Sequence, residues 1–343
     1  MGYHFQLPVI TDLTIDQQAV LNEPNAIAVS GGPGTGKSVV GLWRHIRNYD
    51  TGKCKSLLLT YTKSLERFLA ETCRTKNVLA SNNVNRTYWW RHHLAKPGYD
   101  EIIVDEAQDV SLDTYDFLKR YASAVSYTTD DNQILYPENC SYSRDLQNKF
   151  RNRSFTLSTN FRNTRQITRF VRSIQPDKVI QDGLSNGPVP QLIHLGNDKG
   201  KQLNAILEII STYSDPSHNI AILDPFTTNV INFYNELTAK GIRCTKFVNE
   251  QEQLHSIERV HVTTFKSCKG LEFNTVIVPN MHSYNFWLQQ HGHLISEKDI
   301  YVVLTRSKNN VFLMNNSHPY YQDENLEFLE MAINRGTIEV ETF

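Results

Sequence analysis

The segment SGGPGTGKS at residues 30–38 constrains the fold of this chain more than any other part. It fits the pattern GxxxxGKS, with the apolar run AIAVS before it and a stretch of helical period after it. Glycines in such a loop let backbone N–H groups surround phosphate oxygens at the start of a helix, while the lysine reaches the β- and γ-phosphates. We therefore expect ATP, with Mg²⁺ on the serine hydroxyl, at Gly31, Gly32, Pro33, Gly34, Thr35, Gly36, Lys37 and Ser38.

Short apolar runs recur along the whole chain, separated by segments of helical period. Most are continuously apolar, which is typical of strands buried on both faces of a parallel sheet. We expect strands at 26–30, 56–61, 102–106, 125–130, 191–195, 220–224, 260–265, 275–279, 301–305 and 311–314. Strands that alternate with helices in two series predict an α/β chain of two tandem lobes with mainly parallel sheets. Functional residues are then expected at the carboxyl ends of the strands.

The length of 343 residues allows two domains that each bury a core. We expect the lobes to be residues 1–153 and 154–343. The boundary falls within the stretch 144–172, which holds eight basic residues and one acid although the whole chain has a net charge of −1. That stretch is either a local polynucleotide surface or a solvated helical face, and the sequence leaves both open.

Several protein classes are disfavoured by composition. The five cysteines are scattered without metal-ligand spacing, which indicates reduced thiols. The N-terminus has no signal-peptide pattern, and no apolar run approaches the roughly 20 residues of a membrane span. We therefore expect a cytoplasmic protein without a membrane partner. The paired histidines at 92–93 and those at 291 and 293 lack neighbouring acids or cysteines, so ordinary hydrogen bonding is favoured over metal binding.

The second chemical motif is YDEIIVDEAQDV at residues 99–110. An apolar strand that ends in two adjacent acids places Asp105 where it can hold Mg²⁺. Glu106 is then placed to orient or deprotonate an attacking water. Two acids at a strand end could be a surface feature, but the phosphate loop makes that interpretation improbable. Together the two motifs predict ATP hydrolysis.

At this point the chain resembles the superfamily 1 helicases, in the branch typified by bacterial UvrD, Rep and PcrA. DEAQD is that branch's form of the magnesium-binding motif, and further motifs match in the family's order across nearly the whole chain. The resemblance implies two RecA-like P-loop domains with the nucleotide cleft between them. It also implies ATP-dependent movement along single-stranded nucleic acid, with DNA favoured over RNA.

The resemblance assigns further residues around the nucleotide. LTIDQQAV implies that Gln17 reads adenine, although Thr14 and Gln17 also fit a helix capping box. TTDDNQILY resembles the motif GDxxQ and implies Gln133 as the sensor of γ-phosphate and water, with Thr129 where glycine is usual. STNFRNT implies that Phe161 stacks on adenine and that Arg162 reaches the γ-phosphate, and DIYVVLTRSK implies Arg306 as a second such arginine.

The same resemblance implies a track for the polynucleotide, made of hydroxyls, cations and stacking rings. VTTFKSCKGLEF (262–273) resembles the motif TxHxxKGLEF, so Thr264 contacts a phosphate and Glu272 bonds the nucleotide ribose. Lys266 stands where histidine is usual and could pair with a phosphate. Of the two tryptophans at 89 and 90 we expect one in the core and one on the track. The other assigned positions are Tyr61, Thr62, Lys63, Thr87, Trp89 and Tyr136, although no tryptophan follows Tyr136.

The spacing between motifs leaves little room for the accessory subdomains of the large family members. We expect a near-minimal motor whose duplex unwinding could depend on a protein partner, such as a separately encoded nuclease. The other function class is a nucleotide-gated binding switch in which turnover is incidental. The set Lys37, Asp105, Glu106, Gln133, Arg162 and Arg306 favours the enzyme, because a switch needs neither a water-activating acid nor two arginines. Pathway, polarity and oligomeric state are left open by the sequence.

Overall fold

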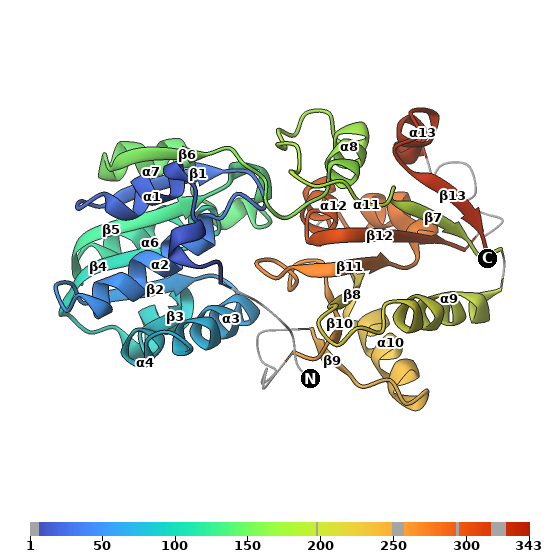
Figure 1. Cartoon of the computed structure of the whole chain (residues 1–343), viewed down its shortest axis with the longest axis horizontal. Coiled ribbons are helices and arrows are strands. Elements are labelled where there is room, and N and C mark those ends of the chain that lie inside the picture. The colour runs from blue at the N-terminus through green and yellow to red at the C-terminus, as the bar shows by residue number, and fades with distance from the viewer. Residues whose placement is uncertain (1–6, 197, 249–256, 293–294, 317–326) are drawn as a thin grey trace. The chain divides into compact units, whose positions relative to one another are not determined.

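The computed structural model describes residues 7–196, 198–248, 257–292, 295–316 and 327–343 (Figure 1). They form two compact units, an N-terminal lobe up to Phe161 and a C-terminal lobe from Arg162 onward. The division therefore falls after the boundary expected at residues 153–154. The reason is strand β6 (Arg153–Leu157), which pairs along β1 (Ile27–Gly31) in the N-terminal sheet.

The N-terminal lobe is built on a six-stranded sheet in the order β3-β2-β4-β5-β1-β6, with every neighbouring pair parallel. Its other strands are β2 (Ser56–Thr60), β3 (Val84–Arg86), β4 (Tyr99–Val104) and β5 (Ala122–Thr129). The helices are α1 (Ile15–Asn22), α2 (Lys37–Asp50), α3 (Lys63–Arg74), α4 (Val78–Ser81), α5 (Thr87–Trp89), α6 (Leu112–Leu118) and α7 (Ser143–Phe150). Because all strands are parallel, their carboxyl ends share one edge.

A buried charge network holds α2 against this sheet. The Glu101 carboxylate on β4 accepts hydrogen bonds from Arg44 at 2.8 Å, from Asn48 at 2.9 Å and from Ser126. Arg44 also donates to the backbone oxygens of Glu23 and Asn25. A buried carboxylate is tolerated only when it is paired and hydrogen-bonded. The network thereby fixes the helix that carries the phosphate loop at its N-terminus.

The C-terminal lobe has a seven-stranded parallel sheet in the order β13-β7-β12-β11-β8-β10-β9 (Figure 1). Its strands are β7 (Gln191–His194), β8 (Ile220–Asp224), β9 (Cys244–Phe247), β10 (Val260–Thr264), β11 (Phe273–Val278), β12 (Ser307–Asn315) and β13 (Glu339–Thr342). Its helices are α8 (Arg165–Ile174), α9 (Lys199–Thr212), α10 (Thr227–Ala239), α11 (Tyr284–Gln290), α12 (Glu297–Leu304) and α13 (Glu327–Asn334). Helix α10 packs on β8, β9 and β10, whereas α8 and α12 pack on β12.

The predicted fold class of two parallel-sheet α/β lobes is confirmed, but one predicted strand is wrong. The run YVVLT at 301–305 lies mostly in helix α12. Ser296 and Asp299 form a capping box at its start, with the Asp299 carboxylate accepting from the Ser296 N–H at 2.7 Å. A short apolar run fits a buried helix as well as a buried strand, so the cap decides. Strands β3, β6, β9 and β13 were not expected. All four lie at the edges of their sheets, and β3, β9 and β13 are only three or four residues long.

The basic stretch at 144–172 is shared between the two lobes. Its members are divided between the two lobes at Phe161. Four of them are ion-paired within their own lobe: Lys149 to Asp116, Arg153 to Glu23, Arg162 to Glu272 and Arg172 to Asp182. Among the described helices, none is long and apolar enough to cross a membrane.

Candidate nucleotide site and polynucleotide track

The phosphate loop lies between the end of β1 and the first turn of α2. Gly34 and Gly36 adopt left-handed backbone with φ of 71° and 86°, which glycine accepts at no steric cost. The Lys37 ammonium donates to the carbonyl oxygens of Gly31 and Gly32, each at 2.8 Å. It also lies 3.7 Å from the Asp130 carboxylate. The loop is thus folded around its own lysine, at the helix N-terminus where phosphate binds best.

Asp105 follows β4 directly and lies beside the loop. Its Oδ1 accepts the Thr128 hydroxyl at 2.5 Å, and its carboxylate also bonds the Ser38 side chain. Oδ2 is buried and has no hydrogen-bond partner among the described residues. Burial, followed by the charge of Glu106, raises the pKa of Asp105 to about 6. A divalent cation would occupy the orphan oxygen and favour the ionised carboxylate.

Ser38 and Asp105 therefore fit Mg²⁺, which is usually held by one or two protein oxygens together with phosphate and water. Bound there, Mg²⁺ would neutralise charge on the phosphates. Within the described part of the chain there is no cluster of three or more His, Cys, Asp or Glu side chains that could hold a metal without the nucleotide.

A chain of hydrogen bonds leads from Glu106 to Asp130, which forms an ion pair with Lys37. Glu106 Oε2 accepts the Gln108 amide at 2.5 Å, and Gln108 Oε1 accepts the Asp130 N–H at 3.1 Å. The Asp130 carboxylate in turn accepts the Gln133 amide at 2.6 Å and faces Lys37. Gln108 and Asp130 were not assigned from the sequence, although both lie inside the quoted motifs. The structure thus brings together Lys37, Asp105, Glu106 and Gln133 at one sheet edge.

Glu106 is only 8 % exposed and has a left-handed backbone with φ of 55°. A non-glycine residue held there costs about 1–3 kcal/mol, and such strain gathers at functional sites. From this backbone position the Glu106 carboxylate accepts the Gln108 amide.

The two predicted adenine residues both lie against the phosphate loop. Gln17 completes the capping box, with its Oε1 accepting the Thr14 N–H at 3.0 Å and its amide donating to the Thr35 carbonyl at 3.1 Å. The capping role is therefore present, and contact with adenine stays a prediction. The Phe161 N–H donates to the Gly34 carbonyl at 2.9 Å, while its side chain is 48 % exposed and lies outside the core.

In the C-terminal lobe, two cationic side chains form ion pairs with one carboxylate. Arg162 Nε donates to Glu272 Oε2 at 3.0 Å, and Lys308 Nζ donates to Glu272 Oε1 at 2.5 Å. Burial alone would raise the pKa of Glu272, but the charges of Arg162 and Lys308 outweigh it and hold the pKa below its usual value. Lys308 was not assigned from the sequence, since a lysine after a motif arginine carries no distinctive signal. Ribose contact by Glu272 stays a prediction.

Arg306, expected as a second γ-phosphate arginine, is instead 1 % exposed. Its Nε donates to the Val302 carbonyl at 3.0 Å, and its other nitrogens lie 3.5 Å from the Leu271 carbonyl and the Thr305 hydroxyl. In this structure the guanidinium therefore supports the C-terminal lobe from inside, and its contact with nucleotide stays a prediction.

A loop fixes the backbone where the C-terminal lobe begins. The Asn163 amide donates to the carbonyl oxygens of Thr305 at 3.1 Å and Ser307 at 2.6 Å. Gly183 lies so close that a Cβ there would overlap the Asn163 carbonyl oxygen and lie 2.8 Å from the Thr164 carbonyl carbon. Hydrogen bonds from Arg165 to the Gly183 and Ser185 oxygens hold the loop in place.

The segment that carries Thr264 and Glu272 joins opposite edges of the C-terminal sheet. Thr264 is the last residue of β10, whereas Glu272 immediately precedes β11. Both strands pair with β8 in parallel, so all three run in the same direction. The expectation that all functional residues follow strand carboxyl ends is therefore wrong for Glu272 and Arg306, which lie at the amino edge. Residues 265–271, here called the crossing segment, connect the edges.

Thr264 is mostly buried, and its hydroxyl bonds Ser267 at 2.9 Å. Lys266 is partly exposed near the carboxyl edge. Burial raises the pKa of Asp299, and the positive charge of Lys266 partly offsets that rise. Lys266 thus has an acidic neighbour in its own lobe.

The predicted track residues of the N-terminal lobe all follow strand carboxyl ends. Tyr61 and Tyr136 come together, with ring centroids 5.0 Å apart. Thr62 is buried as the N-cap of α3, where its hydroxyl accepts the Leu65 N–H at 3.2 Å, and Lys63 opens that helix. The buried Thr87 hydroxyl donates to the Thr60 carbonyl at 3.1 Å. Both threonine hydroxyls are thus hydrogen-bonded within the N-terminal lobe.

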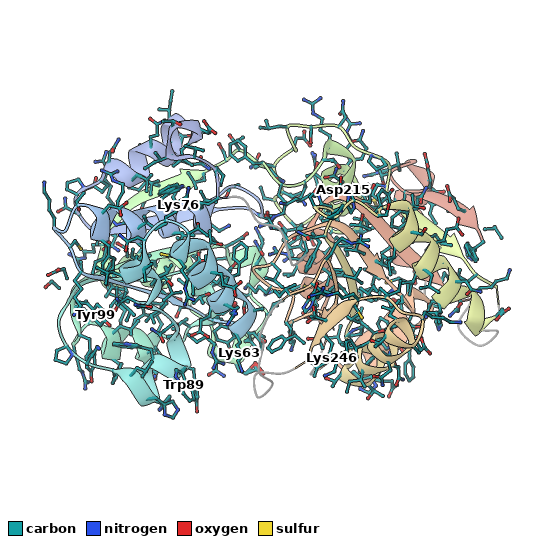
Figure 2. All side chains as sticks on the ribbon, turned by 60° about the horizontal axis from the view of Figure 1, so that its bottom comes forward. Lys63, Lys76, Trp89, Tyr99, Asp215 and Lys246 are labelled. Carbon is teal, nitrogen blue, oxygen red and sulfur yellow. The ribbon has the colours of Figure 1, made fainter. Side chains whose placement is uncertain are left out.

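The two adjacent tryptophans have separate roles. Trp90 is 1 % exposed and packs edge-on against Tyr99 and Tyr121, whereas Trp89 is 44 % exposed. Trp89 lies at the surface of the N-terminal lobe (Figure 2), and its ring is tilted against that of His93 with centroids 3.9 Å apart. One ring is in the core and the other is exposed, so Trp89 is the one that can serve the proposed track.

The chain is similar in sequence to known helicases. The family model of the UvrD-like helicase C-terminal domain matches residues 100–318. R568 of Acanthamoeba polyphaga mimivirus, a predicted ATP-dependent DNA helicase, is 25% identical over 235 residues, which are 62% of this chain and 34% of R568. The chain thus spans about a third of the length of that curated relative.

The solved structure of Saccharomyces cerevisiae Dbp5 bound to RNA and ADP BeF3 is 11% identical, with a TM-score of 0.57 over 96% of this chain and 89% of Dbp5. At that identity the likeness concerns the fold, which is that of two RecA-like helicase domains. Because the family model covers more than half of its residues, the chain belongs to the UvrD-like helicases of superfamily 1.

Proposed function

We propose that this chain is an ATP hydrolase that moves along single-stranded nucleic acid, with DNA preferred over RNA. The observation that carries the proposal is the chain of polar contacts from Lys37, ion-paired to Asp130, through Gln108 to Glu106. It links the residue type that binds phosphate to the one that activates water, beside a carboxylate oxygen suited to Mg²⁺.

In the proposed reaction, Gln133 orients a water for in-line attack on the γ-phosphorus and Glu106 accepts its proton. The bond between the γ-phosphorus and the bridging oxygen of ADP breaks as the new P–O bond forms. Lys37 and Arg162 offset the charge that develops on the phosphoryl oxygens. The proposed track combines the paired rings of Tyr61 and Tyr136 with Trp89, to which bases can stack.

The test is ATP hydrolysis by the full chain with and without single-stranded DNA or RNA. We expect stimulation by DNA that exceeds stimulation by RNA, with falling affinity for the polymer as salt rises. Lack of stimulation by either polymer would refute the motor. A strand-displacement assay with 3′ or 5′ overhangs would then report polarity, and whether unwinding needs a partner such as a separately encoded nuclease.

Lys266 offers a sharper test of the track. We expect Lys266→Ala to weaken binding of single-stranded DNA by about three- to ten-fold, because one phosphate contact is lost, and to lower the salt dependence of binding. ATP affinity should remain unchanged. Fluorescence anisotropy with labelled DNA and labelled nucleotide measures both, and equal loss of the two affinities would contradict the assignment. Lys240→Ala, an exposed lysine after α10, is the matched control.

One observation favours a second candidate, a nucleotide-gated binding switch with little turnover. Arg306 is buried in its own lobe, so the support for a second charge-stabilising arginine is weaker than for Arg162. A switch predicts that ATP alters polymer or protein binding while hydrolysis stays slow with DNA and with RNA.

A further inference from the structure

Two cations in the C-terminal lobe share one carboxylate. Arg162 and Lys308 each donate to a different oxygen of Glu272, at 3.0 and 2.5 Å. The three side chains carry one net positive charge. The Glu272 side chain is 15% exposed, so it needs at least one cation beside it to remain ionised at low cost.

In the proposed function Arg162 turns from this cluster toward the γ-phosphate, and its Nε then gives up the bond to Glu272. Departure of Arg162 removes one positive charge from beside a largely buried carboxylate, and that cost would hold the arginine back. Lys308 lowers the cost because it stays on the second oxygen.

The backbone limits how Arg162 can move. The next residue, Asn163, is bonded to the carbonyl oxygens of Thr305 and Ser307, and Gly183 packs against its carbonyl. The main chain is thereby fixed on both sides of the cluster, since Lys308 directly follows Ser307 in β12. Arg162 can therefore change from Glu272 to another partner only by rotation of its long side chain.

We propose that Lys308 is a positioning residue that keeps Glu272 neutralised while Arg162 moves to the γ-phosphate. This deepens the proposed function and rests on the role given there to Arg162. Lys308 acts through Glu272 and not by contact with the nucleotide.

The test is steady-state ATP hydrolysis without any polynucleotide, for the wild type, Lys308→Gln and Lys308→Arg. Lys308→Gln should lower kcat about ten-fold, the size expected when a charged hydrogen-bond partner is lost, with KM for ATP within about two-fold of the wild type. Lys308→Arg restores the cation and should return kcat to within about three-fold of the wild type. Lys240→Gln controls for the change in net charge, and thermal melting checks that each variant folds.

A double-mutant cycle separates this role from direct contact. In the Glu272→Gln background, Lys308→Gln should have no further effect on kcat, because the carboxylate through which it acts is gone. An undiminished effect there, a KM that rises instead of a falling kcat, or a Lys308→Gln protein with normal kcat would each overturn the proposal.

The outcome is independent of stimulation by a polymer. If wild-type hydrolysis of ATP is not stimulated by nucleic acid, the motor is refuted. The effect of Lys308→Gln on kcat can still be measured in both backgrounds. A wild type with no hydrolysis refutes both.

Discussion

Glu106→Gln should lower the kcat of ATP hydrolysis by about 10²- to 10⁴-fold, the usual contribution of a positioned general base. Glutamine keeps the shape of the side chain and an oxygen that can accept the Gln108 amide, so the hydrogen-bonded chain to Asp130 persists. It cannot accept a proton from water. ATP affinity should therefore be retained, and the protein should melt at nearly the wild-type temperature.

Single-turnover hydrolysis with radiolabelled ATP, alongside equilibrium binding of a fluorescent nucleotide, measures these two effects separately. Glu71→Gln removes an exposed acid on α3 that pairs with Arg67 on the same helix and serves as the matched control. A Glu106→Gln protein that hydrolysed ATP at the wild-type rate would remove Glu106 from the mechanism.

The second large effect is expected from a residue far from any motif. Gly183→Ala adds a methyl group that overlaps the Asn163 carbonyl oxygen, and backbone atoms must shift to accept it. We expect the free energy of unfolding to fall by about 1–3 kcal/mol, as in other overpacked sites. ATP hydrolysis should fall by about ten-fold or more in the folded protein, because a displacement of Arg162 by about 1 Å would be costly in the proposed reaction.

Urea denaturation and kcat measured at a temperature where the variant is folded would distinguish the two effects. Gly200→Ala is the control in the same lobe, since a Cβ there would meet only the exposed Asp198 carboxylate at 3.2 Å. If Gly183→Ala left both stability and kcat unchanged, the loop could not be what fixes the start of the lobe.

The sequence was most informative where function restricts the backbone. The phosphate loop, the DEAQD strand and most buried strands could be predicted, because their glycine spacing and continuous apolar runs are compatible with few backbone conformations. Lys37, Asp105, Glu106 and Gln133 could be expected at one edge because parallel strands end together. The RecA-like fold is confirmed, whereas the roles of these residues stay predictions for the experiments above.

The wrong or missing predictions concern features that cannot be recognised from the order of residues along the chain. The run at 301–305 is helical because of a capping box that begins five residues earlier, at Ser296. Burial of Arg306 depends on where carbonyl oxygens of α12 lie. The position of Glu272 at the amino edge depends on the path of the chain after β10. Lys308 and Gly183 matter through neighbours that are distant in sequence, and no spacing rule points to them.

The crossing segment has a mechanical consequence. Phe265, Cys268, Lys269 and Leu271 are almost completely buried, and the Cys268 N–H and thiol bond the carbonyl oxygens of Thr264 and Phe265. A packed segment of this kind resists compression and transmits displacement with little loss. In the proposed motor, a displacement of Glu272 at one end would therefore be passed to Thr264 at the other with little loss. The two ends would move together because the residues between them are closely packed within one lobe.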